Sequence, residues 1–185
     1  MILEPRWKSY IVATAEPVLT PEQCDELISI GQNEPKINAT IGTTEKITKL
    51  DEKYRKSIIS WIPFAKAVPT YQVIRQWMEV TNNNYFGFDT VQLSEQAQYA
   101  EYYKDGFYNW HMDSNVEMAS MPTVRKISMT LLLNDPAEFE GGELEVMAPG
   151  KFADMKQGHA IMFASFLNHR VNVVKRGVRQ SLVVW

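Results

Sequence analysis

The segment YNWHMDSNVEM places His111 and Asp113 one residue apart in a chain that has only three histidines. Side chains two positions apart in an extended strand point to the same face, so these two can reach a common point. Two ligands alone hold a metal ion poorly. A third ligand must therefore come from a distant segment, and the remaining histidines, His159 and His169, are the two candidates.

Two histidines and one carboxylate on one face of an ion, with open positions opposite, form the ligand set of non-haem Fe(II) oxygenases. The alternative is that these residues are structural. An isolated His-x-Asp pair is common, and a histidine in a β-rich chain is more often partly buried for structural reasons than bound to a metal. The spacing alone leaves both interpretations open.

Arg179 lies ten residues after His169, inside the apolar run GVRQSLVVW. A buried guanidinium needs an anionic partner, because an unpaired buried charge is costly. Its planar fork suits a carboxylate bound through two hydrogen bonds. The partner is either a bound carboxylate ligand or one of the 22 acidic residues of the chain itself.

Two helices are predicted in the first half of the chain. The segment TPEQCDELISIGQ, residues 20–32, begins with Thr20 as a cap, proline in the first turn and Gln23 at the capping-box position. The segment VPTYQVIRQWMEVTNN, residues 68–83, indicates a second helix. Its predicted buried face carries Val73, Trp77 and Val80.

The remaining elements are predicted to be strands. Residues 36–54 are polar and are interpreted as a loop or an irregular hairpin, followed by the strand-like SIISWI. From residue 85 onward, six short β-rich runs are divided by Gly, Pro, Asn or Asp. This pattern predicts an α+β, mainly β fold, in which the N-terminal helices pack against a sandwich or barrel.

Length and composition indicate an ordinary globular protein of one domain, residues 1–185. The formal net charge is −3, with 45% hydrophobic and 22% charged residues and no basic cluster, which argues against nucleic acid as a partner. Cys24 is the only cysteine, so no internal disulfide can form. No apolar stretch approaches the roughly 20 residues of a membrane helix, and no signal peptide is apparent. We therefore expect a cytoplasmic protein without a membrane partner.

Three blocks in this order resemble the 2-oxoglutarate and Fe(II)-dependent dioxygenases, specifically the prolyl 4-hydroxylase-like group with bacterial and phage members. They are YYKDGFYNWHMDS, RKISMTLLLNDPAEFEGGELEV and KQGHAIMFASFLNHRVNVVKRGVRQSLVVW. The resemblance covers residues 96–185, and the N-terminal half matches loosely. It implies a double-stranded β-helix, a jelly-roll and cupin-like barrel, with helical support from residues 1–84 and the catalytic barrel in residues 85–185.

The same resemblance implies roles for individual residues. Fe(II) would be held by His111, Asp113 and His169, which leaves His159 as the spare histidine at a strand end. The co-substrate 2-oxoglutarate would place its far carboxylate at Arg179 and Ser181, and Tyr103 and Tyr108 are expected to contact it. Leu132 departs from relatives that carry a tyrosine near this point. Gly141 and Gly142 are expected to shape a tight turn.

The chemistry implied is hydroxylation of a substrate C–H bond with O₂, while 2-oxoglutarate is converted to succinate and CO₂; ascorbate is a further expected cofactor. The leading substrate is a prolyl residue in a peptide or protein, over which residues 36–54 would close. Trp61 and Trp110 offer an aromatic wall for a proline ring. Two alternatives stay open. One is the same chemistry on a free amino acid, another small molecule or a nucleobase, and the other is a cupin-like module that binds metal without turnover.

Overall fold

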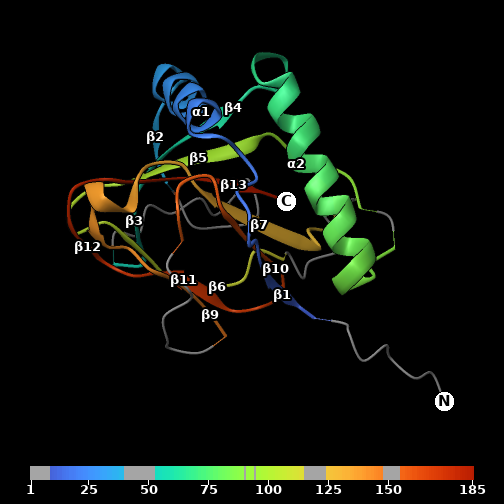
Figure 1. The fold of residues 1–185 in the computed structure, drawn as a ribbon. Coiled ribbons are helices and arrows are strands. Elements are labelled where there is room, and N and C mark those ends of the chain that lie inside the picture. The colour runs from blue at the N-terminus through green and yellow to red at the C-terminus, as the bar shows by residue number, and fades with distance from the viewer. Residues whose placement is uncertain (1–8, 40–52, 90, 94, 115–123, 148–154) are drawn as a thin grey trace.

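A computed structural model describes residues 9–39, 53–89, 91–93, 95–114, 124–147 and 155–185. The fold consists of two antiparallel sheets that face each other, with two helices covering the outer face of the larger sheet (Figure 1). The expected lid over residues 36–54 lies largely outside the described residues; its described part includes strand β2 (Ile37–Asn38), which pairs with β4 (Ile58–Ile62).

The larger sheet has seven strands in the order β1-β10-β7-β13-β5-β4-β2, and every neighbouring pair is antiparallel. The strands not yet given are β1 (Ile11–Ala13), β5 (Ala97–Tyr102), β7 (Ile127–Leu132), β10 (Ala160–Ala164) and β13 (Arg179–Val184). The predicted β-rich runs thus form strands. Almost all residues of the three central strands β7, β13 and β5 are buried, because helices cover one face and the second sheet covers the other.

The smaller sheet has four strands in the order β3-β6-β11-β9. They are β3 (Arg55–Lys56), β6 (Phe107–His111), β11 (His169–Val171) and β9 (Leu144–Val146). A short pair, β12 (Val174–Arg176) and β8 (Glu140–Gly141), closes one end. Strands β1 to β4 come from residues before 85, so the strands of the two sheets are not confined to the range 85–185 that was expected to form the barrel.

Helix α1 (Pro21–Asn33) begins as predicted. The Thr20 side chain accepts a hydrogen bond from the Gln23 backbone N–H at 3.3 Å, and the Gln23 side chain accepts one from the Thr20 N–H at 2.9 Å. This reciprocal pair satisfies two backbone donors that the first turn leaves free. Cys24 and Leu27 are buried against the outer face of the larger sheet.

Helix α2 (Val68–Thr81) forms where predicted, but the predicted buried face is corrected by about one residue. Ile74 and Met78 are almost completely buried, whereas Val80 is 49% exposed and Val73 and Trp77 are only partly buried. Apolar side chains occur around most of this helix, so periodicity alone did not fix the face that packs. Three short helical turns complete the described elements: Phe64–Lys66, Asn82–Phe86 and Pro136–Glu138.

The two apolar cores lie on opposite faces of the larger sheet. On β5, Ala97 and Tyr99 pack toward the helices, while Ala100 and Tyr102 face the smaller sheet. This alternation follows from the two-residue period of a strand. The space between the sheets is therefore lined by every second residue of each central strand, and it is there that the polar site described below lies.

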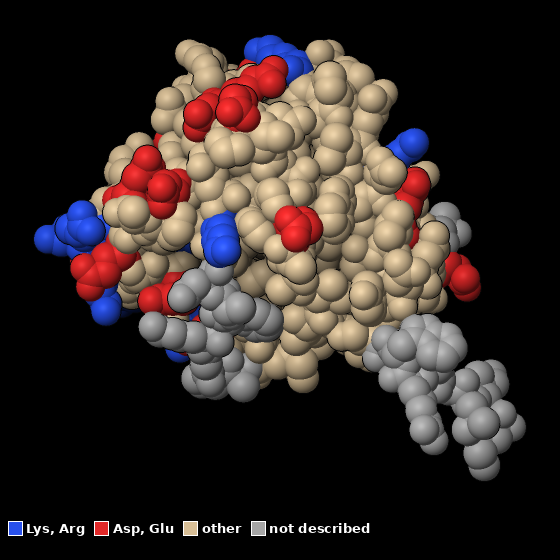
Figure 2. Space-filling model, viewed as in Figure 1, with Lys and Arg blue, Asp and Glu red and all other residues tan. Residues whose placement is uncertain are grey.

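The charged surface is mixed on the face that Figure 2 presents. Lysine, arginine, aspartate and glutamate side chains lie in small separate groups on a mostly uncharged surface. Among the described residues, no helix is both long enough and apolar enough to cross a membrane.

Candidate metal centre

The two strands at the centre of the smaller sheet bring the proposed ligands together. His111 is the last residue of β6, and His169 is the first residue of β11; the two strands are antiparallel with His111 directly opposite His169. Asp113 follows β6 by two residues, and its backbone N–H donates to the carbonyl of Ser165 at 3.0 Å. His111 and His169, which are 58 positions apart in the chain, thus lie on neighbouring strands beside the carboxylate of Asp113.

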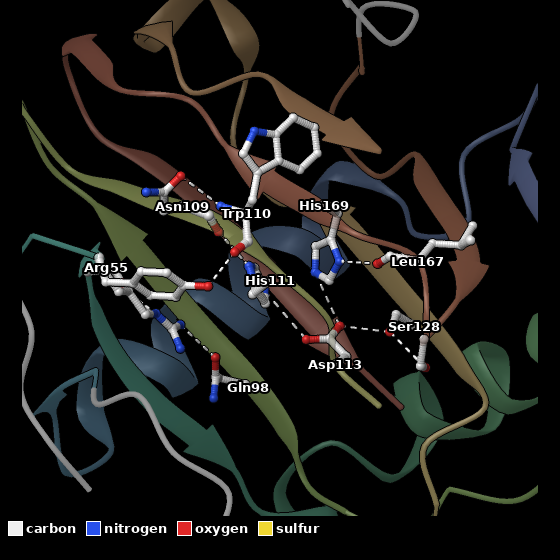
Figure 3. A network of polar contacts seen from close by, with 12 residues as sticks. Arg55, Gln98, Asn109, Trp110, His111, Asp113, Ser128, Leu167 and His169 are labelled. Carbon is white, nitrogen blue, oxygen red and sulfur yellow. Dashed lines mark hydrogen bonds and ion pairs between the residues drawn. The ribbon is translucent and has the colours of Figure 1, made fainter. Parts of the chain in front are cut away.

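His111, Asp113 and His169 each offer one ligand atom, and these atoms all lie within 4.8 Å of one another. The Nε2 of His111 is 3.6 Å from Oδ1 of Asp113, and the Nε2 of His169 is 3.4 Å from Oδ2 (Figure 3). Each imidazole donates from Nδ1 to a backbone carbonyl two residues earlier, Asn109 at 2.8 Å and Leu167 at 3.0 Å. These bonds leave both Nε2 atoms free to bind a cation.

Asp113 is fixed by a further hydrogen bond from the larger sheet. Ser128 on β7 donates from Oγ to Oδ2 of Asp113 at 2.7 Å, and its Oγ lies 2.9 Å from that of Ser165 (Figure 3). Such outer contacts orient a ligating carboxylate and tune its basicity. No sequence motif points to Ser128, because its contact with Asp113 depends on how β7 of the larger sheet lies relative to the end of β6 in the smaller one.

The electrostatics of the cluster suit a bound cation. Burial, together with nearby His169, lowers the pKa of His111 to about 3, although Asp113 acts in the opposite direction. Burial alone would raise the pKa of Asp113, but the hydrogen bond and positive potential from the two imidazoles outweigh it and hold this pKa below its usual range. At neutral pH the cluster thus offers a neutral His111 and an ionised Asp113, the protonation states that a divalent metal requires.

A cavity of about 550 Å³ opens in front of the three ligands. Its lining includes side chains from both sheets: Arg55, Trp61, Gln98, Tyr102, Tyr108, Trp110, His111, Asp113, Arg125, Thr130, His169, Arg179, Ser181 and Trp185. Its size is typical of a site for a small ligand, and its lining combines aromatic side chains with polar and charged ones.

Arg179 is the first residue of β13 and is only 2% exposed. Its Nη1 donates to Oγ of Ser181 at 2.8 Å, and its guanidinium carbon lies 5.6 Å from the centre of the Tyr102 ring. No carboxylate of the described residues lies within 4 Å of it. Burial lowers its pKa, opposed by Tyr102, yet an arginine stays protonated in a protein. Among the described residues this cation thus has no acidic partner, and its position suits an anion that enters the cavity.

The two predicted tyrosine contacts have different outcomes. Tyr108 lines the cavity, and its ring stacks on the His111 imidazole with 3.4 Å between centroids; burial raises its pKa to about 12. Tyr103 does not line this cavity: it is 45% exposed, and its hydroxyl donates to Glu101 at 3.3 Å. Its neighbour Tyr102 faces inward instead, directly opposite Arg179 in the sheet. In this structure it is therefore Tyr102, the last residue of β5, that lies in the cavity lining beside Arg179.

The glycine turn contacts Arg179. Gly142 has φ of +69°, and a Cβ placed there would lie 2.8 Å from Cδ of Arg179. Gly141 has φ of +79°, and its Cβ would lie 2.3 Å from the carbonyl oxygen of Val173. The predicted tight turn is therefore present, and Gly142 additionally leaves room for the arginine side chain.

The other predictions about nearby residues can be placed as well. His159 lies just before β10, and its Nδ1 is 3.2 Å from the carbonyl of Thr14, away from the cluster. Leu132 lies opposite Ser181 and is buried. Because it is a leucine, it supplies no hydroxyl group where some relatives carry a tyrosine. Sequence reasoning missed Trp185, whose buried Nε1 lines the cavity without a hydrogen-bond partner among the described residues.

Comparison with known proteins agrees with this geometry. Residues 97–185 match the family described as the 2OG-Fe(II) oxygenase superfamily. A PKHD-type hydroxylase of Picosynechococcus sp. is 29% identical over 175 residues, which cover 91% of this chain and 74% of that protein. Further PKHD-type hydroxylases match over shorter stretches, and this chain spans only 32% to 41% of their length.

Two solved structures show the fold. The viral collagen prolyl hydroxylase of Paramecium Bursaria Chlorella virus-1, in its 2OG complex, superposes with a TM-score of 0.72 at 21% identity, covering 96% of this chain and 95% of that one. A Trichoplax adhaerens prolyl hydroxylase, in complex with a hypoxia inducible factor oxygen degradation domain peptide fragment, gives 0.68 at 14% identity over 95% and 82%. Together with the two antiparallel sheets, these likenesses confirm the predicted double-stranded β-helix.

Proposed function

We propose that the chain is a 2OG-Fe(II) oxygenase that hydroxylates a prolyl residue of a peptide or protein, using Fe(II), 2-oxoglutarate and O₂; the match of residues 97–185 and the similarity to a PKHD-type hydroxylase support this. One observation carries the proposal: His111, Asp113 and His169 converge at the same cavity that is lined by Arg179, a buried guanidinium with no carboxylate partner in the described part of the chain. A metal ligand set and an anion site in one cavity are what a chelating dicarboxylate co-substrate requires.

The three ligands fit Fe(II) by their chemistry. Two imidazoles and one carboxylate suit this ion and leave positions free on its other side. His111, Asp113 and His169 would hold the ion, while the carbonyls of Asn109 and Leu167 and the hydroxyl of Ser128 keep these side chains in orientation. Bound Fe(II) and 2-oxoglutarate supply the redox chemistry, in which O₂ is consumed, a C–H bond becomes C–OH, and succinate and CO₂ are released.

The far carboxylate of 2-oxoglutarate would lie against Arg179. Ser181 accepts from Nη1 of this arginine and so fixes the direction of the guanidinium fork, and Tyr102 faces the same point from the neighbouring strand. Arg179, Ser181 and Tyr102 are thus assigned to bind and orient the co-substrate. The fork favours a carboxylate bound through two hydrogen bonds, which fixes the distance of the keto acid end from the metal ligands.

Aromatic side chains form the wall that would receive the substrate. Trp61, Trp110 and Trp185 line the cavity together with Tyr108. A proline ring is apolar and packs well on such faces, and the same residues would exclude water from the reacting bond. The peptide complex of the Trichoplax adhaerens prolyl hydroxylase supports a peptide substrate here.

Succinate production tests the proposal. Purified protein would be incubated with Fe(II), 2-oxoglutarate and ascorbate, with and without proline-containing peptides, and peptide mass would be measured in parallel. We expect peptide-stimulated succinate and a mass gain of one oxygen atom. Turnover with small molecules alone would overturn the peptide substrate, and metal binding without any decarboxylation would indicate a binding module instead of an enzyme.

A further inference from the structure

A second buried guanidinium lines the same cavity. Arg55, on strand β3, is only 7% exposed and lies directly across the smaller sheet from Tyr108. It comes from the N-terminal half of the chain, from the strand that completes the edge of the sheet carrying His111. The co-substrate contacts assigned above, Arg179, Ser181 and Tyr102, lie on the other sheet.

The contacts that hold Arg55 are all uncharged. Its Nε donates to Oγ of Ser57 at 2.8 Å, and its Nη2 donates to Oε1 of Gln98 at 2.9 Å (Figure 3). Its guanidinium carbon lies 4.3 Å from the centre of the Tyr108 ring. Within the described part of the chain, no carboxylate comes within 4 Å of this guanidinium.

Two other arginines pair with carboxylates, a kind of partner that Arg55 does not have among the described residues. Arg125, which also lines the cavity, donates to both carboxylate oxygens of Glu95 at 2.7 and 2.6 Å. Arg170, on the far side of the smaller sheet, lies 2.6 Å from Glu145. Arg55 is more deeply buried than either, so the cost of leaving its charge without an anion is greater.

This step rests on the proposed function. In the loaded site, the two charges of Fe(II) and the charge of Arg179 are balanced by Asp113 and by the two carboxylates of 2-oxoglutarate. The charge of Arg55 has no counterpart in that set. Because burying an unpaired charge is costly, a further anion should arrive with the one component still missing, the substrate.

We propose that Arg55 binds a carboxylate of the substrate, and that the enzyme therefore selects a proline beside an acidic group. The distances support this choice. The Tyr108 ring lies between the two sites, 3.4 Å from the His111 ring and 4.3 Å from the Arg55 guanidinium carbon. Consecutive Cα atoms are about 3.8 Å apart, so a carboxylate on a residue adjacent to the reacting proline reaches Arg55. That carboxylate is an acidic side chain or a free C-terminus.

Binding of matched peptides tests the inference without turnover. The protein would be loaded with Zn(II) in place of iron and with 2-oxoglutarate, and affinities would be measured by calorimetry. One peptide pair, blocked at both ends, carries Glu or Gln next to proline; a second pair ends just after proline in a free carboxylate or an amide. We expect the carboxylate member of one pair to bind about tenfold to a hundredfold more tightly than its neutral member. The pair that shows this difference tells whether Arg55 binds an acidic side chain or a free C-terminus.

Variants assign that preference to Arg55. Arg55→Gln should abolish the difference between the matched peptides, while Arg55→Lys should retain part of it, because the charge remains but the two-pronged geometry is lost. Arg75→Gln is the matched control, since Arg75 lies on the exposed side of α2 outside the cavity. It should leave the preference unchanged.

Two results would overturn the inference. The first is equal affinity of wild-type protein for the carboxylate and neutral members of both pairs, a comparison that holds even if Arg55→Gln fails to fold. The second is a loss of 2-oxoglutarate affinity in Arg55→Gln as large as that in Arg179→Gln, which would place Arg55 in the co-substrate site. Either result leaves peptide-stimulated decarboxylation intact, whereas failure of the proposed function would abolish decarboxylation with every peptide.

Discussion

At the scale of single residues, orientation matters as much as identity. His111 and His169 each use Nδ1 to donate to a carbonyl two residues earlier, and this fixes the tautomer that presents Nε2 to the metal position. Asp113 keeps one oxygen toward each imidazole while Ser128 holds Oδ2. The site is therefore preorganised by short local hydrogen bonds and by one bond from the facing sheet.

The histidine assignment predicts unequal effects of two similar substitutions. His169→Ala should abolish metal binding and succinate production, because it removes one of three ligands. His159→Ala should retain most activity, since this ring hydrogen-bonds to the carbonyl of Thr14 and does not belong to the ligand cluster of the described residues. Fe(II) binding by calorimetry and succinate yield would measure both. Equal loss in the two variants would contradict the ligand assignment.

Ser128 is predicted to act through Asp113. Ser128→Ala removes the 2.7 Å hydrogen bond to Oδ2 and should weaken metal affinity or activity by about 10-fold to 100-fold, as outer contacts of metal ligands commonly do. Metal titration under anaerobic conditions would measure the change. Ser29→Ala, on the exposed side of α1, is the control and should have no effect. An unchanged affinity in Ser128→Ala would indicate that the Asp113 backbone alone fixes the carboxylate.

At the scale of elements, the face that α2 buries is testable by stability. Ile74 is 1% exposed whereas Val80 is 49% exposed. Ile74→Ala should lower the free energy of unfolding by about 2–5 kcal/mol, because it leaves a cavity in the core. Val80→Ala should change it by no more than about 0.5 kcal/mol. Urea denaturation would measure both free energies of unfolding. A larger loss of stability in Val80→Ala than in Ile74→Ala would support the buried face that the sequence predicted.

The turn between β8 and β9 links stability to co-substrate binding. Gly142→Ala places a Cβ against Cδ of Arg179 in a backbone conformation that side chains rarely adopt. We expect a loss of about 1–3 kcal/mol in stability together with weaker 2-oxoglutarate binding. Gly141→Ala is the control: it meets the backbone of Val173 and should destabilise the protein without a specific effect on 2-oxoglutarate. Calorimetric titration with 2-oxoglutarate, at a temperature below the Tm of both variants, would separate a loss of binding from a loss of stability.

At the scale of the whole molecule, a bound metal should stabilise the fold. The ligands lie on β6, just after it, and on β11 of the smaller sheet. An ion bound there would be linked to the larger sheet through the hydrogen bond from Ser128 to Asp113. A ligand present at a hundred times its Kd stabilises by about 2.7 kcal/mol, which raises the Tm of a domain of this size by roughly 5–10 °C. A chelator should reverse this shift.

The metal-dependent rise in Tm can be checked by differential scanning calorimetry with Zn(II), which avoids oxidation. His169→Ala serves as the control and should show little dependence on the metal. An equal rise in this variant would mean that the ion stabilises the protein from another position. Since the measurement does not depend on turnover, it tests the ligand set independently of the substrate.

Local patterns in the sequence determined a large part of this protein. The capped helix at Thr20 and the alternating strands depend on contacts within a few residues, so their signals lie close together in the chain. The residue types and the order of the His-x-Asp pair, the later histidine and the arginine identified the candidate site. That His111, Asp113, His169 and Arg179 line one cavity depends on the pairing of distant strands.

Only the tertiary structure decided which face each element buries. Tyr102 rather than Tyr103 faces Arg179 because a one-residue change in strand register exchanges the two faces, and register depends on the partner strand. The same holds for the buried side of α2, which its packing partner selects. Arg55 joins the cavity because β3 pairs with β6 across more than fifty residues of chain, a contact that no local pattern encodes.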